Sequence, residues 1–148
     1  MATLQWIAPT ALATLLTTEL DNLATSTTDT TGFSGLSAEI DNEAGLYEYL
    51  DLELLVNTQA SARGAGGSVA ILVAYAVDPA NYPDASIGAL TTPVTSFGLD
   101  ATVTARRLTR TNLPLAPFKF KLQVWNKTGY AFAASGSTLK YRLHDEGA

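Results

Sequence analysis

The chain has 148 residues, of which 47% are hydrophobic and 16% charged, and its formal net charge is −5. This length suits one domain with a sizeable core. The absence of cysteine excludes disulfides, thiolate zinc sites and cysteine nucleophiles. The acidic balance disfavours nucleic acid as a partner, because phosphate binding requires a basic surface. No apolar run approaches the roughly 20 residues of a membrane helix, so no membrane partner is expected, and the N-terminus lacks the basic start of a secretory signal.

The N-terminal part of the chain predicts one helix followed by a polar arm. Leucines recur at helical spacing over residues 9–23, which favours an N-terminal α-helix. Residues 24–35 are rich in Thr and Ser with almost nothing to bury, which is typical of a surface loop or arm. We therefore expect a single domain over residues 1–148, with the helix and Thr-rich arm in residues 1–35 and a sandwich in residues 36–148.

The rest of the chain carries the alternation of apolar and polar residues that predicts β-strands. Strands are expected at residues 46–56, 69–77, 97–106 and 118–125. The strand at 69–77 is apolar on both faces, as a central strand covered twice would be. The leucine helix or a neighbouring copy of the chain could cover its alanine face, and the helix is the simpler cover.

The C-terminal stretch, residues 118–143, predicts a compact antiparallel unit. Turn residues at 126–129 separate its first strand from an apolar segment, and the alternation returns in the opposite phase at 139–143. With six to eight strands expected and no βαβ rhythm, the predicted fold class is mainly β. The predicted architecture is an antiparallel β-sandwich of jelly-roll type with one N-terminal α-helix.

The sequence offers little for catalysis, so no catalytic residue, cofactor or metal is predicted. The one histidine, His144, lies on the polar face of a predicted strand, where a solvated role is favoured over a catalytic one. Asp51 and Glu53 are expected on the outward face of a strand, without the spacing of a calcium loop or a glycosidase pair. A cation bound by the loop at residues 41–43 is the remaining alternative. The segment at residues 63–67 lacks the lysine and helix of a phosphate loop and predicts a flexible loop.

Five residues are candidates for contacts with other proteins. Arg106, Arg107 and Arg110 form a basic focus that either pairs with carboxylates of a partner or is a solvated strand end. Trp125 is expected to pack in a core or interface rather than to form a sugar-stacking platform. Trp6 is the candidate in the N-terminal segment.

Three segments together resemble a family of small virion structural proteins of tailed bacteriophages, in the same order and over nearly the whole chain. They are LATLLTTELDNL (residues 12–23), AEIDNEAGLYEYLDLEL (residues 38–54) and NKTGYAFAASGSTLKYR (residues 126–142). The resemblance brings no catalytic residues, and it implies a non-enzymatic role.

The role that we infer from the resemblance is capsid decoration or cementing. The expected partners are the major capsid protein and further copies of the chain, as a homodimer or homotrimer, and the expected location is the capsid surface of a virion assembled in the host cytoplasm. The low charged fraction fits a surface covered by other subunits, or equally one made polar by Thr and Ser. The alternatives are a tail or baseplate component and a carbohydrate-binding β-sandwich module.

Overall fold

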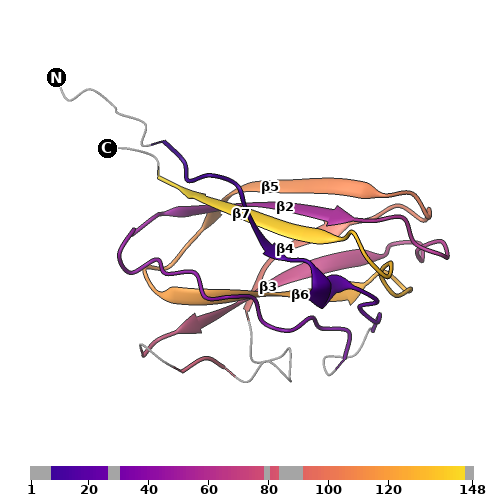
Figure 1. Ribbon diagram of the computed structural model, residues 1–148, viewed down its shortest axis with the longest axis horizontal. Coiled ribbons are helices and arrows are strands. Elements are labelled where there is room, and N and C mark those ends of the chain that lie inside the picture. Colours follow the sequence, from indigo (N-terminus) through magenta and orange to yellow (C-terminus); the bar gives the residue numbers. More distant parts are fainter. Residues whose placement is uncertain (1–7, 27–30, 79–80, 84–91, 146–148) are drawn as a thin grey trace.

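The computed structural model describes residues 8–26, 31–78, 81–83 and 92–145, and in them two antiparallel sheets pack face to face (Figure 1). One sheet has the strand order β1-β7-β2-β5 and the other has the order β4-β3-β6. The predicted mainly β class with two antiparallel sheets is therefore confirmed. The strands are β1 (Ala13–Leu16), β2 (Tyr49–Val56), β3 (Ser68–Ala76), β4 (Thr92–Gly98), β5 (Arg106–Pro114), β6 (Lys119–Lys127) and β7 (Thr138–His144).

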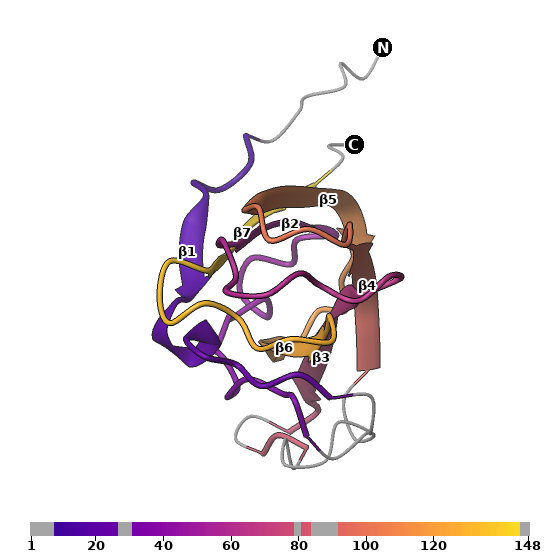
Figure 2. The ribbon, with the colours of Figure 1, turned by 90° about the vertical axis from the view of Figure 1, so that its right-hand side faces the viewer.

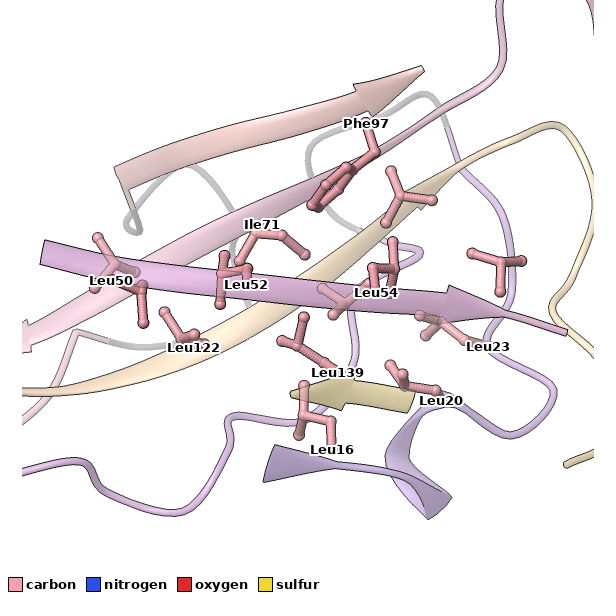
Figure 3. Packing of buried hydrophobic residues seen from close by; sticks show 14 of the residues in the cluster. Leu16, Leu20, Leu23, Leu50, Leu52, Leu54, Ile71, Phe97, Leu122 and Leu139 are labelled. Atoms are coloured by element: carbon pink, nitrogen blue, oxygen red, sulfur yellow. The ribbon is translucent and has the colours of Figure 1, made fainter. Parts of the chain in front are cut away.

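The core lies between the two sheets and is built from the inward residues of each strand (Figure 3). In β2 the residues Leu50, Leu52 and Leu54 alternate with more polar neighbours and are almost fully buried, because successive side chains of a strand point to opposite faces. The strand β3 is central in its sheet, and Leu72 on its outer face is 1% exposed. Both predictions about β3, its central place and its two buried faces, are confirmed.

The predicted N-terminal α-helix is wrong. Residues 9–23 instead form β1 and a single 3-10 turn, η1 (Thr18–Leu20). Of the leucines at helical spacing, Leu16 and Leu20 are buried because β1 pairs with β7 and the chain then turns beneath the core, whereas Leu12 is exposed. The abundant Thr residues of this segment lower its helix propensity, and β7 offers backbone partners that a helix would not use. The alanine face of β3 therefore has no α-helix over it in the described chain.

The predicted strand at residues 97–106 is also wrong in its limits, and β5 is missing from the prediction. Residues 99–105 form the loop that carries the chain from β4 in one sheet to β5 in the other. Although Phe97 and Leu99 are buried, Val103 is 40% exposed, so the alternation does not continue inward. The strand β5 escapes the pattern because it lies at a sheet edge and most of its residues are exposed.

The C-terminal residues do not form the predicted antiparallel unit, because β6 and β7 lie in different sheets. The segment between them crosses from one sheet to the other, and its backbone pairs with the N-terminal part of the chain. Phe132 donates its N–H to the carbonyl of Leu23, and Ala133 accepts from the N–H of Asn22. These bonds direct residues 130–133 away from β6.

An irregular segment extends the second sheet beyond β6. The backbone N–H groups of Ser34, Ser37 and Ile40 donate to β6 carbonyls at 2.8 Å each. In return, the Ser34 and Ser37 hydroxyl oxygens accept the N–H groups of Val124 and Leu122, both at 2.9 Å. Each serine hydroxyl thus takes the place of a strand carbonyl as the acceptor. The bonded residues are three apart in the segment, but their partners are two apart in β6. An irregular edge of this kind is a poor template for pairing with another strand. The described residues of the predicted Thr-rich arm therefore pack on β6.

Removing either serine hydroxyl measures how much this edge contributes to the free energy of unfolding. We expect Ser34→Ala and Ser37→Ala each to lower the free energy of unfolding by about 1–2 kcal/mol, since each leaves a buried N–H of β6 without an acceptor. Denaturant titration measures the loss, and hydrogen exchange should speed up at Val124 or Leu122 respectively. The control Ser61→Ala, at an exposed serine, should change neither, and an unchanged exchange rate in the first two variants would contradict this account.

Candidate functional site

A polar groove lies on the outer face of the first sheet, where β2, β5 and β7 run side by side. Two adjoining hollows of about 390 Å³ and 200 Å³ share Asp51, Thr111 and Arg142 in their linings. We call this the polar groove. Its larger part is lined in addition by Ala8, Pro9, Asn112, His144 and Asp145, and its smaller part by Leu12, Leu52, Glu53 and Thr109.

A β-bulge in β5 shapes the floor of the polar groove. The register between β2 and β5 shifts so that two residues, Thr111 and Asn112, lie opposite Asp51. Asn112 has a φ of 57°, in the left-handed region, which asparagine tolerates better than most residues. Bulges of this type turn side chains and backbone toward a neighbouring strand, and here the bulge directs the Asn112 N–H to Asp51 Oδ1 at 2.9 Å.

Asp51 is outward-facing, as predicted, but its side chain is only 8% exposed. Arg142 Nε donates to its Oδ2 at 2.7 Å, and the Asn112 N–H donates to Oδ1. Three strands are thus joined at one carboxylate. The alternation of β2 gave the face of Asp51 correctly, but it could not reveal the bulge that covers it.

His144 is more enclosed than the solvated role predicted for it. Its side chain is 15% exposed, its ring stacks on Tyr49 at 5.4 Å between centroids, and its Nε2 lies 3.0 Å from Asn112 Oδ1. The other nitrogen, Nδ1, lies 3.6 Å from Asp51 Oδ1. The imidazole is therefore held within the polar groove by β2 and β5, and not free on the surface.

The three candidate arginines all belong to β5, and each is engaged within the chain. Arg106 forms an ion pair with Asp100, and Arg107 Nη1 lies 2.6 Å from Glu53 Oε1. Arg110 lies over the ring of Phe97 at 5.3 Å and donates to the Ser96 carbonyl at 3.3 Å. Figure 2 shows β5 and β4 together along one side of the sandwich. Binding of a partner carboxylate by these arginines stays a prediction, and it would compete with their present contacts.

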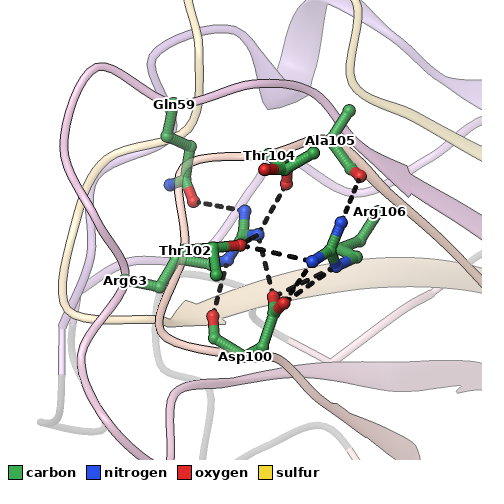
Figure 4. A network of polar contacts seen from close by, with 7 residues as sticks. All are labelled: Gln59, Arg63, Asp100, Thr102, Thr104, Ala105 and Arg106. Carbon is green, nitrogen blue, oxygen red and sulfur yellow. Dashed lines mark hydrogen bonds and ion pairs between the residues drawn. The ribbon is translucent and has the colours of Figure 1, made fainter.

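Arg63 is the centre of a buried polar network at the end of the sandwich (Figure 4). Its guanidinium donates to Gln59 Oε1 at 2.9 Å, to the Thr104 carbonyl at 2.7 Å and to the Asp100 carbonyl at 3.1 Å. Its Nη2 also lies 3.2 Å from Asp100 Oδ1. These contacts tie the loop at residues 57–67 to the loop at 99–105. The expected flexible loop is thus anchored by its arginine, a role that the sequence analysis missed.

The same network perturbs Asp100. The hydrogen bond from Arg106 is the largest cause that lowers the pKa of the Asp100 carboxyl from 3.8 to about 2. Desolvation opposes this shift, and a hydrogen bond from Arg63 adds to it. Because the folded pKa is depressed, the carboxylate contributes stability that is present above about pH 4 and lost as the pH falls toward 2.

This dependence can be measured by denaturant titration of the wild type and Asp100→Asn across the acid range. The difference in unfolding free energy should be constant above about pH 5 and should shrink between about pH 4 and 2. In a third protein, Arg106→Gln, removal of the main cause should move the loss to higher pH. A difference that does not change with pH would contradict the assignment.

Trp125 packs within the chain, although its role in an interface stays a prediction. Its ring lies 4.9 Å from that of Phe33 between centroids, and the Lys127 ammonium lies 4.3 Å from its centre. Trp125 Nε1 is buried and has no hydrogen-bond partner in the described part of the chain. These contacts leave less of the ring open for a stacked sugar. Trp6 lies outside the described residues.

At the opposite end of the sandwich from Arg63, a rigid turn precedes β2. Asn42 is fully buried, its Nδ2 donates to the carbonyls of Tyr47 and Ala116, and its Oδ1 accepts the Tyr47 N–H. The turn holds Leu46 at a φ of 50° with its side chain 61% exposed, which is a strained conformation for a leucine.

Two more exposed apolar residues lie at the same end. Val77 follows the last residue of β3 and is 81% exposed, and Phe118 precedes β6 and is 36% exposed. The pairing of Ala76 with Lys119 brings these two strand ends together. We call Leu46, Val77 and Phe118 the apolar end. In Figure 1 it lies at the left, where β2 and β6 begin.

In the loop at residues 41–43, where a bound cation is the alternative to the favoured structural role, the carboxylate of Asp41 has contacts within the chain. Asp41 Oδ1 accepts the N–H groups of Glu43 and Ala44, at 2.9 and 3.4 Å, and Asp41 Oδ2 lies 3.9 Å from Lys119 Nζ. Among the described residues, no group of three or more His, Cys, Asp or Glu side chains is placed to hold a metal ion. The carboxylate of Asp41 therefore caps a turn.

Comparison with known proteins finds no family model that matches the chain and no curated protein that matches its sequence. The resemblance to phage virion proteins stays a prediction on the three segments that carry it. A search of the described residues for a helix long and apolar enough to cross a membrane finds none.

Proposed function

We propose that the chain is a non-enzymatic structural protein of a bacteriophage virion, which decorates the capsid and stabilises it by bridging shell subunits. Its partners would be the major capsid protein and further copies of itself. The observation that carries the proposal is the apolar end, where a buried asparagine holds Leu46 in a strained conformation with its side chain in solvent. Strain maintained at an exposed residue is a mark of functional sites.

The proposal includes a jelly-roll fold. In an eight-stranded jelly roll, strands 1-8-3-6 form one sheet and strands 2-7-4-5 the other. If residues 33–40 are counted as the second strand, the order β1-β7-β2-β5 becomes 1-8-3-6. The other sheet, with this segment beside β6, becomes 2-7-4-5. The backbone bonds of Ser34, Ser37 and Ile40 to β6 support this count.

The apolar end is suited to a protein partner because its three side chains are apolar and exposed, and the strand ends next to Val77 and Phe118 pair with one another. Exposed apolar patches with a polar surround mark interaction sites, and a few buried anchors supply most of the binding energy of an interface. Many weak contacts repeated over a shell would add up through multivalency. The docking surface therefore need not be extensive in each copy.

Leu46→Gly separates docking from folding. Glycine adopts a positive φ without strain, so the variant should be as stable as the wild type or up to about 1 kcal/mol more stable. On shells purified without this chain, we expect its affinity in a co-sedimentation assay to fall by about tenfold, because an anchor is lost.

The matched control is Leu12→Gly, which removes an exposed leucine elsewhere in the chain. It should bind shells as the wild type does. Equal binding by Leu46→Gly and the wild type would overturn the apolar end as the docking surface. Failure of the wild type to bind shells at all would overturn the decoration role and favour a tail or baseplate location.

A further inference from the structure

The polar groove is not used by the proposed docking at the apolar end. We propose that the polar groove binds a neutral polyhydroxyl ligand, such as a sugar ring of a glycan. Four features of the polar groove support this ligand: unused hydrogen-bonding groups, rigidity, charge and shape.

The floor of the polar groove holds donors without partners in the described residues. Arg142 uses Nε for Asp51, while its two terminal nitrogens bond to no described group and its side chain is 43% exposed. The Nδ2 of Asn112 and the hydroxyl of Thr111 likewise bond to no described group. Asp145 accepts the Glu48 N–H with Oδ1 only, at 2.7 Å, which leaves Oδ2 as an acceptor. Vicinal hydroxyls, which both donate and accept, match this mixture of groups.

These groups are held in place before any ligand arrives. Asp51 fixes Arg142 on one side and the bulge at Asn112 on the other, and the stacking on Tyr49 fixes the ring of His144. Side chains locked in this way lose little conformational entropy on binding, which raises affinity for a small ligand.

The charge of the polar groove favours a neutral ligand over an anion. The Arg142 guanidinium is offset by the carboxylate of Asp51 at 2.7 Å, and the carboxylate of Asp145 lines the same hollow. A phosphate or carboxylate would meet two like charges and one opposite charge in the same hollow. A hydroxyl carries no such penalty, and it can bond to carboxylate and guanidinium alike.

The shape and wall of the polar groove suit a sugar ring. The larger hollow, about 390 Å³, is within the range of small-ligand sites. Pro9 contributes an apolar wall to the larger hollow and Leu12 to the smaller one, and such surfaces can pack against the C–H groups of a ring while the floor bonds to its hydroxyls.

Saturation-transfer NMR with the full chain tests the proposal. The probes are D-glucose, D-galactose, D-mannose and N-acetyl-D-glucosamine at millimolar concentration, with sodium acetate as the anionic probe. Two variants alter the floor of the polar groove. Asn112→Gly removes the side-chain amide and is compatible with the positive φ. Arg142→Lys keeps a positive charge beside Asp51 but removes the planar guanidinium with its terminal donors. Lys140→Gln is the control, since Lys140 is on the same strand and lines neither hollow, although its partner Glu53 lines the smaller one.

We expect transfer to at least one sugar with the wild type and Lys140→Gln. We expect a loss of about tenfold or more in affinity with Asn112→Gly and Arg142→Lys, both checked for folding by thermal melting. The absence of transfer to every sugar would overturn the proposal, as would undiminished binding in both floor variants. Binding of acetate but of no sugar would make the polar groove an anion site instead.

Discussion

Replacing Arg63 with Met should lower the free energy of unfolding by about 3 kcal/mol. Methionine fills much of the volume of the arginine stem but donates no hydrogen bond. The Gln59 Oε1 and the carbonyls of Asp100 and Thr104 would then lose their donor in a site from which water is largely excluded. The cost comes from these acceptors rather than from Asp100, whose carboxylate is 41% exposed and keeps Arg106.

Denaturant titration measures this loss, and Arg107→Met is its matched control. Arg107 is 57% exposed and has one ion pair, with Glu53, so its replacement should cost less than about 1 kcal/mol. Hydrogen exchange supplies a local test, because the Gln59 N–H donates to the Val103 carbonyl in the loop that Arg63 anchors. Exchange at Gln59 should speed up in Arg63→Met. Equal losses in the two variants would contradict the anchoring role.

Asn126→Asp should be similarly destabilising, by about 3–5 kcal/mol at neutral pH, although it changes hardly any volume. Asn126 is fully buried, and its Nδ2 donates to the carbonyls of Leu23 and Tyr130, both at 2.9 Å. Its Oδ1 accepts the N–H and the hydroxyl of Thr128. In Asn126→Asp a carboxylate oxygen would replace Nδ2. It would face the carbonyl oxygens of Leu23 and Tyr130, and no group would donate a hydrogen bond to join them.

The loss in Asn126→Asp should depend on pH in a defined direction. The buried carboxyl is favoured in its protonated form, which can donate one of the two bonds, so its pKa in the folded protein is raised above the unfolded value of about 4. The loss should therefore shrink as the pH falls from neutrality toward about 4 and level off below it. Asn22→Asp is the control, since the Asn22 side chain makes no hydrogen bond within the described residues, and its effect should stay within about 0.5 kcal/mol. A loss that is independent of pH would contradict this reading of the Asn126 site.

The arrangement around Asn126 also explains why the end of the chain departs from the sequence prediction. Residues 126–129 have the composition of a hairpin turn, and Gly129 does take a positive φ. The side chain of Asn126, however, bonds to the carbonyls of Leu23 and Tyr130 and so joins the chain after the turn to the N-terminal part. A tertiary contact of this kind leaves no periodic trace in the sequence.

Strands with one buried face were the predictable part of the fold. In β2 and β6 the alternation follows burial closely, because every second residue faces the core. An edge strand such as β5 buries too little to show a pattern, so it was missed. The leucines Leu16 and Leu20 are four residues apart for a different reason, a strand followed by a tight turn, which periodicity alone does not distinguish from a helix.

The polar groove could be predicted only in part. The outward face of Asp51 and the polar face of His144 followed from alternation, and both lie on the outer side of the sheet. Their proximity depends on the register of β2 with β7, which pairs Tyr49 with His144 and Asp51 with Arg142, and on the bulge at Asn112. Register and bulges are set by packing across the whole sheet.

The most direct test of the proposed phage origin and decoration role is electron microscopy of intact virions labelled with gold-conjugated antibody against the chain. We expect label distributed over the head. Label confined to the tail, or no label on intact particles, would contradict decoration of the capsid surface.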